Sequence, residues 1–423
     1  MLTSLLLSVL TASLVTAAPS CELAQPSQPA TPPVSVPNNG STTTSFISAA
    51  WFPGWEAASF PFSSINWQKY SLITWSFAIT TQDPAVLSLD ASGPTYISDF
   101  VKEAQAHGTM ASISVGGWTG SRYFSSAVTP QNRSTFVKAV LDLAAEYNLD
   151  GIDFDWEYPN KPGIGCNEVS GSDSENFLGF LQELRAQPAA KNLYLTAAVS
   201  TSPFAGPDGQ PMTDVSKFAE VLDHIAVMNY DINGQWTTDT GVGPNAPLDD
   251  SCSTVQTGSA TKAIKAWVTA GFPADKIVLG VPAYGHSYTV SPSNAVDGSG
   301  NLAAYPPFTK NPPTSSVDQC GNPEAKSDIM NFATLIGEGF LKDDGTPANG
   351  IKSRFDQCSQ TPFVYDQTKQ LMVSYDDPQS FAAKGKFIVQ NNLLGFSMWE
   401  ITGDHNDLLI DSLTTAAGVT SDC

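Results

Sequence analysis

Apolar residues recur along the chain in short runs that alternate with segments of helical spacing. From residue 46 onward eight runs can be followed, at 46–52, 71–79, 109–116, 149–157, 193–200, 224–230, 276–282 and 393–399. Several are nearly continuous, which is typical of parallel strands that are buried on both faces. Between the runs, apolar residues return every three or four positions, for example at Phe177, Phe180, Leu181 and Leu184, and this spacing predicts amphipathic helices.

Eight strand–helix units predict an α/β fold of the (β/α)8 TIM-barrel type. A doubly wound open sheet is the alternative, but it does not normally need eight units. The regular spacing breaks once, where residues 286–365, rich in Ser, Pro, Gly and Asn, separate the seventh run from the eighth. A structureless loop of this length is improbable inside a compact fold. We therefore predict a small α+β insertion domain between strands 7 and 8, beside the face where barrel enzymes place their active sites.

The two ends of the chain differ from the barrel in composition. Residues 1–18 are uncharged and largely apolar and end in small residues, which predicts a signal peptide and a secreted, extracellular protein. Residues 19–45 are rich in Pro, Ser and Thr and are expected to form an extended arm. The barrel is expected over 46–285 and 366–412, and a C-terminal tail over 413–423.

Six scattered cysteines contain no CxxC pair, and an even number in an exported chain predicts disulfides rather than a metal cluster. Fifteen pairings are possible. We expect Cys320–Cys358, Cys166–Cys252 and Cys21–Cys423. Asn39 and Asn132 begin glycosylation sequons that export would make usable.

The net charge of −21 excludes some partners. Such a surface repels phosphate backbones and anionic lipids, so we expect neither nucleic-acid nor membrane binding. Four histidines without an HExxH pattern make a catalytic metal improbable, and we expect no cofactor. An uncharged polymer is compatible with this surface, and a monomer is expected.

The most informative segment is Asp150-Gly-Ile-Asp-Phe-Asp-Trp-Glu-Tyr-Pro159. In a strand, alternate side chains share a face, so Asp153, Asp155 and Glu157 would lie together, opposite three large apolar residues. A calcium loop would be richer in Gly and Asn, and a solvated edge strand would not need that apolar face. Burial and mutual repulsion should leave at least one acid protonated near neutral pH. A protonated acid beside an ionised one suits acid-catalysed cleavage of a glycosidic bond.

Five motifs in order resemble those of family 18 glycoside hydrolases, the chitinases. The acidic segment resembles the family signature DxxDxDxE, and four further segments agree with it: Ser114-Val-Gly-Gly117-Trp118, Met228-Asn-Tyr230-Asp231-x-x-Gly-x-Trp236, Leu279-Gly-Val-Pro-Ala-Tyr-Gly285 and Gly395-Phe-Ser-Met-Trp399-Glu400. The resemblance covers roughly residues 46–412 and implies a TIM barrel with an insertion domain, as in fungal-type secreted chitinases.

The resemblance implies a role for each acid. Glu157 would protonate the leaving oxygen, and the 2-acetamido group of the sugar would attack the anomeric carbon in place of a protein carboxylate, the known exception to the two-carboxylate scheme. Asp155 would bind the acetamido N–H, Asp153 would modulate Asp155, and Tyr230 would hold the acetamido oxygen. Glu157 would then activate water, with retention of configuration and an acidic pH preference.

The resemblance also implies a set of substrate-binding residues: Trp399 as the floor, Trp118 and Trp236 as stacking platforms, and Met228, Asp231, Tyr158 and Gly117 around them. Two departures are visible. Trp51 and Phe52 stand where the family usually has tyrosines, which predicts the loss of a hydroxyl near the cleaved bond. His286 stands where many relatives have arginine, and it would become charged at acid pH if it lined the cleft.

Together these inferences predict a secreted, endo-acting chitinase that cleaves the β-1,4 bonds of chitin and chitooligosaccharides. A lectin on the same barrel is an alternative, although such relatives usually lack the acid that Glu157 supplies. An endo-β-N-acetylglucosaminidase that trims N-glycans is another, but Tyr230, Asp231 and the insertion argue against it.

Overall fold

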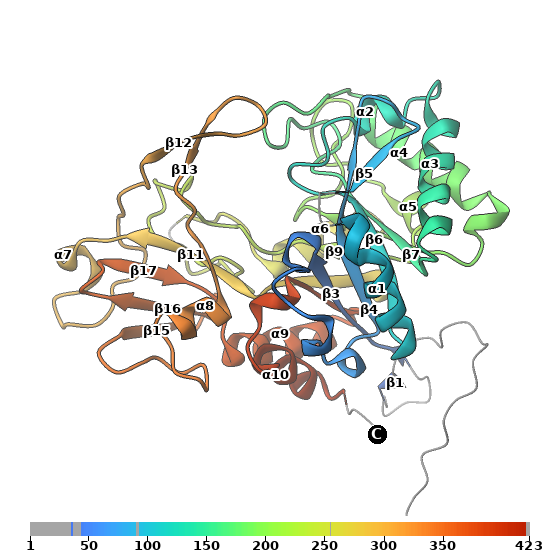
Figure 1. Cartoon of the computed structure of the whole chain (residues 1–423). Coiled ribbons are helices and arrows are strands. Elements are labelled where there is room, and N and C mark those ends of the chain that lie inside the picture. Colours follow the sequence, from blue (N-terminus) through green and yellow to red (C-terminus); the bar gives the residue numbers. More distant parts are fainter. Residues whose placement is uncertain (1–34, 37–43, 90–92, 254, 420–423) are drawn as a thin grey trace, which may run out of the picture.

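The computed structural model describes residues 35–36, 44–89, 93–253 and 255–419, and its central feature is a closed barrel (Figure 1). The eight predicted runs all form parallel barrel strands: β3 (Ile47–Pro53), β4 (Leu72–Thr80), β6 (Met110–Gly116), β7 (Gly151–Asp155), β8 (Tyr194–Val199), β9 (His224–Val227), β10 (Ile277–Pro282) and β18 (Gly395–Trp399). Pairing of β3 with both β18 and β4 closes the ring, so the TIM-barrel prediction is confirmed. The short strand β5 (Leu87–Leu89) adds antiparallel to β4.

Helices surround the barrel and bury their apolar stripes against it (Figure 1). The longer ones are α1 (Gly93–Ala106), α3 (Arg133–Glu146), α4 (Asp173–Arg185), α6 (Ala260–Thr269), α9 (Pro378–Gln390) and α10 (Leu408–Ala417). Short helices α2 (Phe124–Ala127) and α5 (Ser216–Ala219) lie in barrel loops. Phe177, Phe180, Leu181 and Leu184 of α4 are all buried, as their spacing predicts. Residues 413–417, expected to be tail, continue α10.

The insertion between β10 and β18 is a five-stranded antiparallel sheet in the order β14-β11-β17-β16-β15. Its strands are β11 (Tyr284–Thr289), β14 (Ile329–Asn331), β15 (Lys352–Asp356), β16 (Thr361–Asp366) and β17 (Leu371–Ser374). Helices α7 (Pro292–Ala295) and α8 (Phe332–Gly337) accompany it, and a separate hairpin is formed by β12 (Pro313–Val317) and β13 (Pro323–Ala325). Figure 1 shows this sheet as a second lobe beside the barrel.

Both described disulfides join a barrel loop to the insertion. Cys166 pairs with Cys320, and Cys252 pairs with Cys358, so the expected pairs Cys320–Cys358 and Cys166–Cys252 are wrong. The error has a physical reason: pairing requires Cα atoms within about 7 Å, and proximity across the two lobes cannot be read from sequence distance.

Several expectations fall outside the described residues. These are the signal peptide, most of the arm, Cys21, Cys423 and the sequon at Asn39. Within the arm, β1 (Ser35–Val36) pairs with β2 (Thr44–Ser45). Asn132 of the other sequon uses its side-chain amide to donate to the Ser126 carbonyl. In the part of the chain that the structure describes, no helix combines the length and apolar character needed to span a bilayer.

Candidate active site

The acids of β7 follow the predicted alternation. Ile152, Phe154 and Trp156 are buried among the surrounding helices, which leaves Asp153 and Asp155 on the barrel interior. The strand ends at Asp155, so Glu157 stands two residues beyond it, on the loop at the carboxyl end of the barrel. This end is the one at which TIM-barrel enzymes place their catalytic residues.

Asp153, the deepest acid, is held by three donors from three other strands. Its Oδ2 accepts from Trp51 Nε1 at 3.1 Å and from Ser114 Oγ at 2.8 Å, while its Oδ1 accepts from Thr196 Oγ1 at 2.7 Å. Ser114 and Thr196 are its direct register partners on β6 and β8. Burial raises the pKa of Asp153, and these three hydrogen bonds act in the opposite direction.

Asp155 is held differently. Its Oδ1 is buried and finds no hydrogen-bond partner among the described residues. Burial, and then the charges of Glu157 and Asp153, raise its pKa well above the usual range. Asp153 has three donors that favour its anion, so a proton shared within this pair is better held by Asp155. Asp155 also lines the cavity at the barrel mouth, so its carboxyl group can accept a hydrogen bond from a group that enters there.

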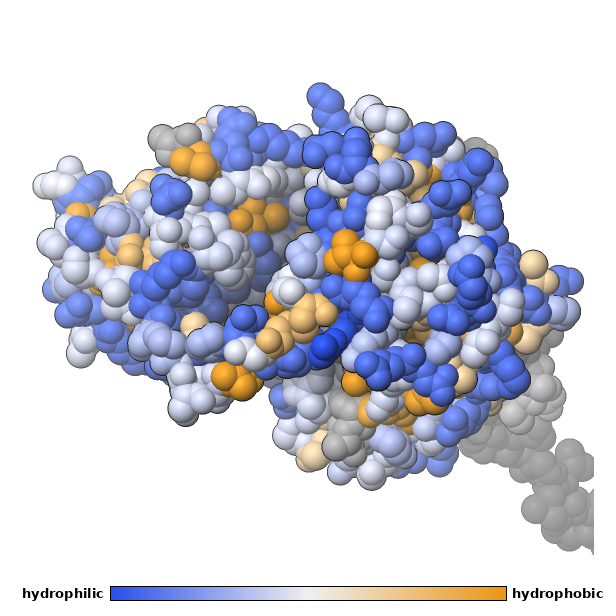
Figure 2. Space-filling model, turned by 90° about the horizontal axis from the view of Figure 1, so that it is seen from above, coloured by the Kyte–Doolittle hydropathy of each residue, from blue (hydrophilic) through white to orange (hydrophobic). Residues whose placement is uncertain are grey.

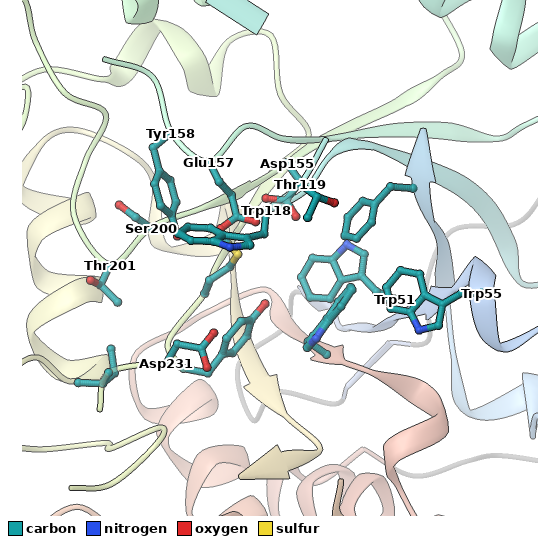
Figure 3. Close-up of a pocket in the computed structure, with 15 residues that line it drawn as sticks. Trp51, Trp55, Trp118, Thr119, Asp155, Glu157, Tyr158, Ser200, Thr201 and Asp231 are labelled. Carbon is teal, nitrogen blue, oxygen red and sulfur yellow. The ribbon is translucent and has the colours of Figure 1, made fainter. Parts of the chain in front are cut away.

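Glu157 has the protonation state that a general acid needs. Burial raises its pKa to about 7; a hydrogen bond with Tyr158 lowers it in part, and the nearby charge of Asp231 raises it. A carboxyl group with this pKa keeps much of its proton at neutral pH and most of it in mildly acidic solution. Figure 3 shows Asp155 and Glu157 side by side, with Asp231 across the cavity.

A cavity of about 420 Å³ opens at this position. It is lined by many of the predicted residues: Trp118, Asp155, Glu157, Tyr158, Met228, Tyr230, Asp231 and Trp399. Its aromatic floor is a cluster in which Trp399 lies 5.5 Å from Phe77, 6.2 Å from Trp51 and 6.3 Å from Trp55, measured between ring centroids. Flat apolar surfaces of this kind pack well against sugar rings.

Two residues expected to bind substrate lie outside this cavity. Gly117 has a φ of +80°, and a Cβ there would approach the Phe77 ring to within 2.8 Å. Gly117 therefore packs against Phe77, which lines the cavity, and does not line it itself. Trp236 is half-exposed farther out, with its ring edge-on to His286 at 5.4 Å. It flanks the cleft at the insertion side.

Trp51 and Phe52, which stand where the family usually has tyrosines, face opposite sides of β3. Phe52 is buried against Phe60, Phe62, Trp75 and Phe100, so it faces the helices. Trp51 faces the barrel interior, where its indole N–H supplies a donor to Asp153.

His286 is buried and does not line the cavity. Its Nε2 lies 2.8 Å from Asp231 Oδ1 and its Nδ1 lies 2.8 Å from Asp328 Oδ2. Although burial lowers its pKa, hydrogen bonds with these two carboxylates prevail and raise it to about 9. His286 is therefore already charged at neutral pH. Charging at acid pH was expected only if His286 lined the cleft, and it does not line this cavity. It holds Asp231 in place together with Tyr284 Oη, which donates to the same oxygen at 2.7 Å.

Sequence reasoning missed several members of the site. Ser114 and Thr196 bind Asp153, while Trp55, Phe77, Ser200 and Thr201 line the cavity. One signal was available for the first two, since Ser114 and Thr196 are polar residues inside largely apolar strand runs. Such residues face the barrel interior or another buried partner, because a buried hydroxyl needs a hydrogen bond.

Comparison with known proteins identifies the family. The profile of "Glycosyl hydrolases family 18" matches residues 48–404, which is most of the chain. The chain belongs to glycosyl hydrolase family 18. The acidic strand, the aromatic floor and Tyr230 thus lie in a family 18 barrel.

Individual relatives refine this assignment. A "chitinase-like effector" of Moniliophthora roreri is 47% identical over 385 residues, which cover 88% of this chain and 93% of that protein. A "chitinase-like effector" of Moniliophthora perniciosa is 42% identical, covering 90% and 89%. Among solved structures, a chitinase from Rhizomucor miehei superposes with a TM-score of 0.77 at 32% identity, covering 87% of this chain and 99% of that one.

Proposed function

We propose that this family 18 protein is a secreted chitinase. In this proposal it hydrolyses the β-1,4 bonds between N-acetylglucosamine units of chitin and chitooligosaccharides, with retention of configuration. The substrate's own acetamido group acts as the nucleophile, and Glu157 acts first as the acid and then as the base.

One observation carries the proposal: Asp155, whose buried Oδ1 has no partner among the described residues, lines the same cavity as a Glu157 whose pKa is raised to about 7. A second protein nucleophile is not needed if the acetamido group attacks, but that group must be oriented and its developing positive charge stabilised. Asp155 lines the cavity beside Glu157 and suits that task, because it can accept a hydrogen bond from the acetamido N–H. Once Asp155 has given up its proton, this bond is charge-assisted and about twice as strong as a neutral one.

The surrounding residues support the same chemistry. Tyr230, Met228 and Asp231 line the cavity with the acids, and Trp399 forms its floor. As the leaving group departs, positive charge spreads over the sugar ring, and the acidic wall of Asp155 and Asp231 would stabilise it electrostatically. The chitinase of Rhizomucor miehei, 32% identical, has the same fold.

A second candidate is binding of chitin oligosaccharides without turnover. The observation that favours it is that the two Moniliophthora relatives are each called a "chitinase-like effector". Glu157 is present in this chain, and an acid with a raised pKa has no evident use in a protein that only binds. We therefore place hydrolysis first.

The deciding experiment is an assay of the purified protein on the N-acetylglucosamine hexamer, with reducing ends and product anomers followed by chromatography. We expect β-anomeric products and shorter oligomers. A high-mannose glycoprotein should remain uncut. Tight hexamer binding without any cleavage would overturn the hydrolase proposal and favour the binding function.

A further inference from the structure

The hairpin of β12 and β13, with its flanking residues 311–326, leaves the insertion domain and reaches the barrel (Figure 1). We call this segment the arch. All residues of both strands are exposed, so the arch has solvent along both faces. A two-stranded ribbon of this kind is marginally stable by itself. Its position must therefore come from what holds its two ends.

The base of the arch is fixed beside Trp236. Asn311 donates its backbone N–H to Gln235 Oε1 at 2.9 Å, and its side-chain amide donates to the Lys326 carbonyl at 3.1 Å, which ties the two legs together. Gln235 in turn donates to the Ser287 carbonyl of β11 at 2.7 Å. The base is thus attached to the loop after β9, next to an exposed indole.

The tip of the arch is fixed beside Trp118. Gln319 donates to the Thr119 carbonyl at 2.9 Å, and Cys320 is bonded covalently to Cys166 in the loop after β7. Thr119 follows Trp118 and lines the catalytic cavity. The tip is thus attached to the barrel wall next to a second exposed indole.

These two attachments lie on different sides of the cleft. The loops after β6 and β9 are separated around the barrel by β7 and β8, yet Thr119 of the first and Asp231 of the second line the same cavity. A segment fixed at both places connects these two sides, and Figure 1 shows the arch running from the insertion lobe to the barrel. Seen from above, the surface is hollowed between the two lobes, and a band of side chains runs from one lobe to the other (Figure 2).

We propose that the arch closes the cleft into a covalent ring, so that a polysaccharide chain enters the site by threading a free end. This inference rests on the proposed function, because it concerns how that substrate reaches Glu157. The ring consists of the arch, the Cys166–Cys320 bond, the barrel loops and the insertion sheet. An extended chain cannot pass sideways through a covalent bond. The arch thereby selects chain ends and short oligomers over positions inside a long polymer, which departs from the endo action expected from the sequence.

The disulfide is the decisive part of this ring. Without it, the tip would be held by the hydrogen bond of Gln319 to Thr119, in which both partners are exposed to competing water. Such a contact opens readily, and the exposed ribbon could then swing aside. The Cys166–Cys320 bond converts a movable flap into a fixed ring.

The test compares wild type with Cys166→Ser/Cys320→Ser, which opens the ring. A matched control is Cys252→Ser/Cys358→Ser, which removes the other link between the lobes and leaves the ring closed. Two substrates are used, the N-acetylglucosamine hexamer and long, soluble glycol chitin. The measurements are kcat/KM on the hexamer and, on the polymer, the loss of viscosity per reducing end formed.

We expect similar hexamer kcat/KM in all three proteins, within about twofold. Viscosity loss per reducing end should rise at least about fivefold in the ring-opened variant alone, because cuts inside the chain then become accessible. An unchanged ratio in that variant, or an equal rise in the control, would overturn the ring. Absence of hexamer cleavage by wild type would instead count against the proposed hydrolysis.

Two further experiments apply if the ring-opened variant does not fold or if the protein has no turnover. If the ring-opened variant does not fold, the arch can be shortened by replacing residues 314–324 with Gly-Ser-Gly together with Cys166→Ser. If turnover is absent, association rates can be followed by tryptophan fluorescence with chitin fragments of increasing length. The ring predicts a rate constant per chain that does not increase with length, and opening the ring should make it increase. A length-dependent rate in the closed protein would refute threading.

Discussion

The indole N–H of Trp51 lies 3.1 Å from Oδ2 of Asp153, so a side chain of the first barrel strand reaches across the interior to the deepest acid of the fourth. An indole can donate but cannot accept a hydrogen bond at this nitrogen. It therefore favours the ionised form of Asp153 and cannot take up the proton itself. The negative charge is therefore favoured on Asp153, the deepest acid, and the exchangeable proton is favoured on Asp155, which lies nearer the cavity.

Replacing Trp51 tests this arrangement. Trp51→Phe removes the donor, so the pKa of Asp153 should rise further and kcat on the hexamer should fall about tenfold, as for loss of a hydrogen bond to a charged group. The acidic limb of the kcat/KM profile should move to higher pH. Trp51→Tyr, which restores a donor, is the control and should recover most of the activity. An acidic limb that stays where wild type has it would contradict this role.

Glu157→Gln should separate chemistry from binding. We expect kcat to fall by about 10²- to 10⁴-fold, because the amide cannot deliver a proton to the leaving oxygen. Oligosaccharide binding, measured by calorimetry, should persist, since the aromatic floor is unchanged. Glu220→Gln, at an exposed position, is the control. Turnover that survives in Glu157→Gln would reassign the acid.

The raised pKa of Glu157 also predicts a cost in stability. Between the ordinary value of 4.5 and about 7, the folded protein retains a proton that the unfolded chain has released, so this group lowers stability as pH rises through that window. The Glu157→Gln variant lacks this effect. Its free energy of unfolding relative to wild type should increase by up to about 3 kcal/mol from low to neutral-to-alkaline pH. Urea unfolding at both ends of the window measures it, and a pH-independent difference would be inconsistent with a buried, titrating Glu157.

Asp155→Asn should disable substrate assistance. We expect a loss of about 10²- to 10³-fold in kcat, comparable to removal of a preorganised electrostatic partner. Fully deacetylated chitosan oligomers should not be cut by wild type, because they lack the attacking group. Asp150→Asn is a matched control at the opposite end of the same strand, where the carboxylate binds the backbone of Ala111. Equal rates on acetylated and deacetylated oligomers would argue for a protein nucleophile.

His286 should stabilise the fold in a pH-dependent way. Its pKa is raised from 6.5 to about 9 by Asp231 and Asp328, so its contribution is complete below pH 6.5 and is lost as pH rises through 9. His286→Leu should therefore lower the free energy of unfolding by up to about 3 kcal/mol at acidic and neutral pH, and by progressively less above pH 9. Thermal unfolding across this range measures the effect, with His107→Leu on the surface as the control. A cost that does not shrink at alkaline pH would mean that packing dominates.

Much of the site was predictable because the relevant physics is local. The alternation of Asp153 and Asp155 with Ile152 and Phe154 is a property of one strand, and it placed the two acids on one face without knowledge of any neighbour. The eight apolar runs likewise report burial on both faces, and this was enough to predict the barrel.

What the sequence determined by itself was therefore the set of strands and the column of acids on β7, because a two-residue period and continuous apolar runs follow from backbone geometry alone. The tertiary structure decided the rest. Trp51, Ser114 and Thr196 meet Asp153 only because barrel closure and register bring three other strands to it. Cys166 meets Cys320 because the hairpin of β12 and β13 reaches from the insertion to the barrel. Such contacts depend on distances between segments far apart in the chain, and no local pattern encodes those distances.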